Sequence, residues 1–252
     1  MPTVATEVGL HRGVPAALPA QAPAREDTAA LPVVRVRVWD LPTRLFHWLL
    51  AAGVGGLVLS GRAGGAWIDW HARLGSLVLA LLLFRLVWGV FGGRWSRFAS
   101  FLPTPSRLRR YLAGGAKPDD EAGHSPLGGL SVLAMLGLLL AQVATGMVSD
   151  DGGGFTGPLN AQVSAAVAEA ATGLHKDYGQ WLLLGLVLLH VAAIVFYRVV
   201  RKRRLLQAML DGDKRLAPDR LVAASRDDTG SRTAAGVVFA VSLAAVLLVV
   251  GL

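Results

Sequence analysis

The chain has 252 residues, of which 53% are hydrophobic and only 17% are charged, and its formal net charge is +8. A soluble domain carries about a quarter charged residues, so this composition indicates a membrane protein. The absence of cysteine excludes disulfides, iron–sulfur clusters held by this chain and covalently attached c-type haem. The basic residues fall between apolar segments, which favours membrane topology over nucleic-acid binding as the reason for the positive charge.

The apolar segments follow a polar amino-terminal stretch. Residues 1–31 are rich in Ala and Pro and lack the hydrophobic centre of a signal peptide, which predicts a disordered tail. Five segments then have about the length that crosses the hydrocarbon of a bilayer. The predicted spans are 43–61, 71–91, 126–148, 174–199 and 233–252. The expected fold class is therefore an all-α integral membrane protein.

The segments between the spans differ in charge. Residues 94–125 are basic and carry three prolines, which predicts a loop with a short interfacial helix. Residues 150–173 are acidic to neutral, and their second half is expected to form a short helix on the membrane surface. Residues 200–232 are charged and are predicted to be a polar linker before the last span.

The charges also predict the orientation, because cytoplasmic loops are enriched in Lys and Arg. One side of the predicted membrane has Arg35, Arg37, Arg44, Arg94, Arg97, Arg107, Arg109, Arg110, Lys117, Arg198, Arg201, Lys202, Arg203 and Arg204. The other side has only Arg62 and Lys176, together with several acidic residues. The amino terminus is therefore expected in the cytoplasm and the carboxyl terminus outside.

Four histidines take defined depths in this topology. His175 and His190 share the fourth span, which has no charge between Asp177 and Arg198. Fifteen residues of α-helix advance about 22 Å and return to nearly the same side, so the two rings lie near opposite faces of the membrane. His71 begins the second span at the outer edge, and His47 lies early in the first span, near the inner face.

Only two pairs of histidines lie at the same depth in the predicted membrane, namely His71 with His175 and His47 with His190. Two imidazoles at one depth can bind the iron of a haem from both sides, and this closed coordination suits electron transfer. The sequence thus predicts two noncovalent haems, with the fourth span contributing to both. The alternative is that single histidines anchor helix ends, or that His47 beside Trp48 belongs to an aromatic belt.

Three further residues lie on the faces of these histidines. Gly75 and Gly179 each follow a histidine by four residues, and glycine there lets a flat macrocycle lie against the helix. Ordinary close packing of helices is the alternative. Arg85 is expected inside the bundle beside the inner haem, where its guanidinium can bind a propionate. Its alternative is extension to the inner headgroups near Trp88.

Three polar residues remain at or in the third span. His124 precedes the span at the inner surface, where capping or headgroup contact is the expected role, with a quinone or proton-handling site as the alternative. Gln142 and Thr145 are expected to hydrogen-bond across helices, with a quinone contact as the alternative.

The sequence resembles the bacterial cytochrome b561 and nickel–iron hydrogenase b-type cytochrome family. The resemblance covers about residues 34–215 and rests on VRVWDLPTRLFHW (36–48), WHARLG (70–75), LLLFRLVWGVFGGRWSRFASFLPTP (81–105), GHSPLGGL (123–130) and the pair His175 and His190. It implies a cytochrome b membrane domain at 32–215, with four helices, two b-type haems and His47, His71, His175 and His190 as ligands. Residues 216–252, a linker and the fifth span, lie outside it.

The resemblance also implies a function in the bacterial inner membrane. Members carry electrons between membrane quinone and a partner redox protein, such as a hydrogenase or a c-type cytochrome. We expect an electron-transfer subunit of an oxidoreductase complex that contacts lipid, quinone and its partner, with the partner docking at the outer loop 150–173. Two alternatives stay open, a self-contained quinone-coupled superoxide or ferric reductase and a haem-free anchor or transporter.

Overall fold

A computed structural model describes residues 2–3, 34–218 and 222–251. The predicted disorder of residues 1–31 falls almost entirely outside the described residues. Residues 32–252 form one compact unit. Its elements in chain order are β1 (Val34–Arg37), α1 (Leu41–Ala63), α2 (Ile68–Phe91), α3 (Pro105–Leu112), α4 (Pro118–Ala122), α5 (Pro126–Val148), α6 (Ala165–Gly173), the π-helical turn η4 (Leu174–Gly179), α7 (Gln180–Val199), α8 (Leu205–Asp211), β2 (Asp213–Leu216) and α9 (Thr229–Val250), with short 3₁₀ turns at Gly65–Trp67, Phe98–Ser100 and Asn160–Gln162.

The prediction of five apolar spans is confirmed. The described chain contains five helical stretches long and apolar enough to cross a membrane, and each overlaps one predicted span. Four of them begin at a side-chain cap, and in two of these a proline follows. Asp40 accepts a hydrogen bond from the backbone N–H of Thr43 before α1, and Ser125 accepts one from Gly128 before α5, each with a proline in the first turn.

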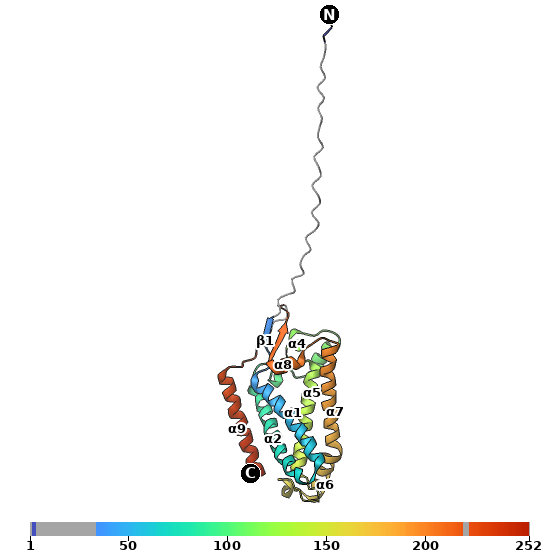
Figure 1. Cartoon of the computed structure of the whole chain (residues 1–252), viewed down its shortest axis with the longest axis vertical. Helices are drawn as coiled ribbons and strands as arrows, with labels where there is room; N and C mark the ends of the chain where they lie inside the picture. The colour runs from blue at the N-terminus through green and yellow to red at the C-terminus, as the bar shows by residue number, and fades with distance from the viewer. Residues whose placement is uncertain (1, 4–33, 219–221, 252) are drawn as a thin grey trace. The chain divides into compact units, whose positions relative to one another are not determined.

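Helix α2 is the most buried of the spans. Helices α1 and α5 pack against it, α9 packs against its other side, and α7 packs against α5 (Figure 1). Phe84 of α2 meets Phe239 of α9 with ring centroids 6.2 Å apart. The buried residues of this core are Phe46, Val78, Leu81, Leu82, Phe84, Trp88, Leu136, Leu139, Leu183 and Ala235. A polar group on the inward face of α2 between Val78 and Gly89 is thus buried among the neighbouring helices.

The helix predicted in the second half of 150–173 is present as α6, but it is not the separate short helix that was expected. It continues without a break through η4 into α7, forming one helical rod at Ala165–Val199. A rod of 35 residues is about 50 Å long, whereas the hydrocarbon of a bilayer is about 30 Å thick. The α6 end therefore extends beyond the hydrocarbon.

Two short strands close the other end of the bundle, and the sequence analysis missed both. Strand β1 pairs antiparallel with β2, with Val34 opposite Leu216 and Arg37 opposite Asp213. Segment 200–232, expected to be a plain linker, thus contains α8 and β2. The strands, α8 and the loops beside them share a second buried cluster of Val36, Val38, Trp39, Trp95, Ala122, Ala208 and Leu216. Segment 94–125, predicted to hold one short helix, contains two, α3 and α4.

Candidate functional site

The structure brings the four histidines together in two pairs. His71, in the first turn of α2, faces His175 of η4 with ring centroids 6.0 Å apart. His47 of α1 faces His190 of α7 at 6.5 Å. These are the pairs that depth in the membrane predicts. Their members on the rod, His175 and His190, are fifteen residues apart.

The spacing within each pair fits a shared metal atom. Two imidazoles bound on opposite sides of one iron, each at about 2 Å, have ring centroids about 6 Å apart. Both observed distances agree with this value. The donor set is also suitable, because neutral imidazole nitrogen is a common axial ligand of haem iron.

Hydrogen bonds orient both rings of the outer pair. The Nδ1 atom of His71 lies 3.0 Å from the carbonyl oxygen of Leu57 in α1. The Nδ1 atom of His175 lies 2.8 Å from the carbonyl oxygen of Gln142 in α5. A carbonyl accepts only from a protonated nitrogen, so Nε2 of each ring is left with its lone pair for a metal. In the inner pair, Nδ1 of His47 is buried and has no hydrogen-bond partner among the described residues.

The side chain of Gln142 also holds the backbone beside His175. Its Nε2 donates to the carbonyl oxygen of His175 at 2.8 Å, which confirms the predicted hydrogen bond across helices. The Gln180 side chain donates to the next carbonyl, that of Lys176. With these carbonyls engaged by side chains, the backbone adopts the rarer π-helical turn, a feature frequent at functional sites. The Thr145 hydroxyl donates to carbonyl oxygens within α5, and it also makes the predicted hydrogen bond across helices, to His175 Nδ1 at 3.4 Å.

We expect Gln142→Leu to weaken haem binding at the outer pair. The variant removes the amide donor to His175, and loss of a group that orients a metal ligand costs about 10- to 100-fold in affinity. The measurement is haem content on titration with limiting haem, together with the midpoint potential of each haem. Gln162→Leu makes the same chemical change at an exposed site and is the control. Equal haem content and equal midpoint potentials in the two variants would contradict a role of Gln142 in orienting His175.

Glycines let α1 and α5 approach the outer pair. A Cβ atom on Gly61 would lie 3.1 Å from the His71 ring, and one on Gly146 would lie 2.9 Å from the His175 ring. The sequence analysis missed both, although Gly61 follows His47 by almost four helical turns and so lies on the same face of α1. Each leaves room for a histidine ring to turn toward its partner.

The two predicted glycines have different surroundings. A Cβ atom on Gly75 would meet no described atom within 4 Å, so its face of α2 is open. A Cβ atom on Gly179 would collide with Oε1 of Gln142. The structure therefore explains Gly179 by close packing, the alternative given above, since it accommodates the side chain that holds His175.

Arg85 lies inside the bundle. Its side chain is only 3% exposed, and its guanidinium lies 4.7 Å from the ring centroid of Phe98 and 6.0 Å from that of Phe46. Its Nη1 atom is buried and has no hydrogen-bond partner among the described residues. This geometry does not match extension to the headgroups. A buried guanidinium with an unused donor fits a site for a carboxylate.

Asp40 ties the start of α1 to the end of α2, and the sequence analysis missed it. The carboxylate is fully buried and accepts hydrogen bonds from Thr43 N at 2.8 Å, Trp88 Nε1 at 3.3 Å, Gly93 N at 3.1 Å and Ser96 Oγ at 2.8 Å. The only signal in the sequence was an acid directly before an apolar helix, which is typical of a cap. This network fixes the helix that carries His47 against the helix that carries Arg85.

His124 has neither of its expected surface roles. Ser125 caps α5 in its place, and the His124 ring packs against Trp39 and Phe101 with centroid distances of 4.7 and 4.4 Å. Burial, with the positive charge of Arg85 nearby, lowers the pKa of His124 to about 3. The ring is therefore neutral at physiological pH. Its Nδ1 has no hydrogen-bond partner in the described part of the chain.

Comparison with known proteins gives one result. The family model described as prokaryotic cytochrome b561 matches residues 38–212, which is more than half of the chain. The match includes all four histidines, Arg85 and Gln142, and it ends before α9. No curated protein and no solved structure matches the chain.

Proposed function

Because the chain belongs to the prokaryotic cytochrome b561 family, we propose that it carries electrons across the membrane between a quinone and a partner redox protein, using two b-type haems. The family itself establishes a multi-pass membrane cytochrome that binds b-type haem and takes part in electron transfer. It therefore excludes the haem-free anchor. The number of haems, their ligands, the quinone and the partner belong to the proposal.

The observation that carries the proposal is the pairing of histidine rings at 6.0 and 6.5 Å at two positions fifteen residues apart on one helical rod. His71 and His175 would hold one haem, and His47 and His190 the other. When bound, b-type haem accepts and donates a single electron at its iron. A spacing of fifteen residues, about 22 Å along the rod, supports two sites toward opposite membrane faces.

The residues around the pairs suit electron transfer better than chemistry on a substrate. An imidazole on each side leaves no open position for oxygen or another ligand. The carbonyls of Leu57 and Gln142 hold the outer rings in one orientation, so little rearrangement accompanies a change of charge. Arg85 would hold a haem propionate at the inner site. Its positive charge favours the carboxylate in its ionised form.

Haem content tests the proposal directly. We expect the purified chain to contain two noncovalent b-type haems, as the pyridine haemochrome assay measures them, and to give the visible spectrum of six-coordinate low-spin iron. A redox titration should resolve two components, because the outer rings are hydrogen-bonded through Nδ1, whereas Nδ1 of His47 has no partner within the described residues. A content of one haem per chain would refute the two-site arrangement.

We also propose that the end with β1, α3 and α8 faces the cytoplasm. The chain has no cysteine, so single cysteines can report its orientation. Arg109→Cys is exposed in α3, and Gly153→Cys lies in the exposed loop at the other end. In intact cells with a permeabilised outer membrane, an impermeant maleimide should label only Gly153→Cys. Labelling of only Arg109→Cys would mean that the orientation is the reverse of the one proposed.

The loop 150–173 is the proposed docking site of the redox partner. With the start of η4, it lines a cavity of about 650 Å³ that includes Asp150, Glu169 and Asp177. These acidic groups favour a partner with a basic face, such as a c-type cytochrome or a hydrogenase subunit. The alternative is a self-contained superoxide or ferric reductase. Quinone-coupled reduction of small oxidants by the purified chain alone would favour that alternative.

A further inference from the structure

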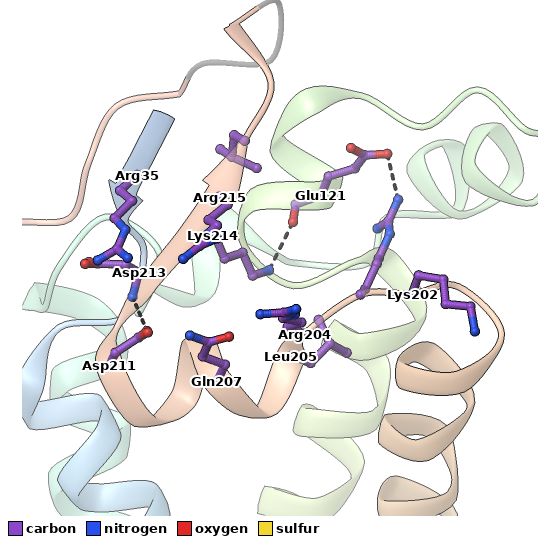
Figure 2. Close-up of a pocket in the computed structure, with 12 residues that line it drawn as sticks. Arg35, Glu121, Lys202, Arg204, Leu205, Gln207, Asp211, Asp213, Lys214 and Arg215 are labelled. Carbon is purple, nitrogen blue, oxygen red and sulfur yellow. Dashed lines mark hydrogen bonds and ion pairs between the residues drawn. The ribbon is translucent and has the colours of Figure 1, made fainter. Parts of the chain in front are cut away.

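A second cavity lies where the fourth span leaves the membrane. It has a volume of about 300 Å³ and is walled by β1, α4, the segment after Val199, α8 and β2 (Figure 2). Its residues 202–205 begin only three positions beyond the end of α7. The cavity is therefore at the boundary between hydrocarbon and water, whichever way the chain is oriented.

The acidic side chains of this cavity are already engaged. Glu121 accepts from Arg203 at 2.8 Å, and Asp213 forms an ion pair with Arg37 at 3.0 Å. The carboxylate of Asp211 accepts a hydrogen bond from the backbone N–H of Asp213 at 2.9 Å. Two of the three carboxylates are thus paired with arginines, and the charge of Asp211 alone is left to offset the other cations of the cavity.

Four basic side chains around the same cavity have no such partners. Lys202, Arg204, Arg35 and Arg215 line it, and none of them makes a side-chain hydrogen bond or ion pair within the described chain. They come from three separate segments: β1, β2 and the linker before α8. Their convergence on one cavity leaves it with an excess of positive charge.

Lys214 adds a cation at the inner wall. Its Nζ donates to the carbonyl oxygens of Glu121 at 3.0 Å and Gly123 at 3.2 Å, which uses two of its three N–H groups. Burial, together with the nearby charge of Arg203, lowers the pKa of Lys214 to about 8. In Figure 2, Lys214 and Arg204 occupy the space between β2 and the start of α8. An anion there would favour the charged form of Lys214.

The backbone at the cavity is also strained. Lys202 has φ of +53°, and it is the one residue other than glycine with positive φ in the described chain. This conformation costs energy for a residue with a Cβ atom and persists mainly at sites that use it. It turns the chain after α7 so that the segment 202–205 lines the cavity.

We propose that this cavity binds a phosphate group, supplied either by the headgroup of an anionic lipid or by free phosphate. Basic pockets at the ends of transmembrane helices suit lipid phosphates, and Arg binds phosphate through paired N–H donors. The proposal does not depend on how the histidines hold haem.

The test compares two double variants with the same change of charge. Lys202→Gln/Arg204→Gln removes two cations from the cavity, and Arg109→Gln/Lys117→Gln removes two exposed cations of the neighbouring loop. Binding of phosphatidylglycerol and phosphatidylcholine to the detergent-purified holoprotein is measured by native mass spectrometry. Binding of radiolabelled inorganic phosphate is measured by equilibrium dialysis. Both use 0.15 M ionic strength, where charges more than about 8 Å apart are largely screened.

Two basic residues near a headgroup are worth about 1 kcal/mol each, so the cavity variant should bind phosphatidylglycerol roughly 30-fold more weakly. The loop variant should change by less than about twofold under this screening. Unchanged haem content checks folding, and Arg35→Gln provides a second variant that leaves 202–205 intact. Selective loss for phosphatidylglycerol alone supports a lipid headgroup, and selective loss for inorganic phosphate supports free phosphate. Binding of neither ligand, or equal losses in both double variants, would overturn the proposal.

Discussion

His190→Ala is expected to lower the haem content of the purified protein to about half and to remove one component from its redox titration. The variant deletes one ring of the pair formed with His47 and leaves His71 and His175 untouched. A single remaining imidazole and a cavity in place of the second ligand should not retain haem through purification. The component that survives should keep the low-spin spectrum of a site with two imidazoles.

Two variants control this experiment. Leu189→Ala removes the neighbouring side chain, which is 64% exposed, and should leave both haems in place. His175→Ala should remove the other redox component, so the two histidine variants are complementary. Loss of both components from His190→Ala alone would mean that the sites do not form independently. Loss of neither would refute His190 as a ligand.

Asp40→Ala is expected to lower the free energy of unfolding by about 3–5 kcal/mol, because several buried donors would each be left unsatisfied at a cost of about 1–3 kcal/mol. Those donors come from the start of α1, from α2 and from the turn after it. The measurement is guanidinium unfolding of the detergent-purified protein, followed by tryptophan fluorescence. The inner site should also lose haem at lower denaturant than the outer site.

Asp119→Ala is the matched control for that prediction. Asp119 is exposed in the first turn of α4, where an acidic side chain contributes at most a few tenths of a kcal/mol through the helix dipole. An Asp40→Ala protein that unfolds at the same denaturant concentration as Asp119→Ala would refute the structural role of the network.

The features that followed from the sequence are those set by single helices and by the membrane. Length and apolarity predicted all five spans, and the basic residues assigned each histidine a depth. Histidines at different depths, such as His71 and His190, cannot bind one iron. Only the pairs His71 with His175 and His47 with His190 therefore remained. The depths of His175 and His190 in the fourth span therefore predicted their partners His71 and His47, although the sequence does not show which helices are adjacent.

The features that could not be predicted depend on contacts between distant segments. The π-helical turn at His175 requires Gln142 from another helix, so the spacing along the fourth span alone indicates a regular α-helix. The strands β1 and β2 have four residues each, and their stability comes from pairing with one another and from the buried cluster that they share with distant segments. The sequence around Asp40 indicates only a helix cap. Three of its hydrogen-bond donors lie beyond residue 87, so its role in joining α1 to α2 cannot be predicted locally.

The pairing of β1 with β2 also sets an order of assembly. Strand β1 is among the first parts of the domain to be synthesised, but its partner emerges only after four spans have been made. Such a distant contact forms late, because the chain between the strands must be ordered first. Until then, the edge of β1 is open to pairing with other chains. Closure of this two-stranded sheet therefore marks the point at which the first four spans have been made and the edge of β1 is covered, with α9 still to follow.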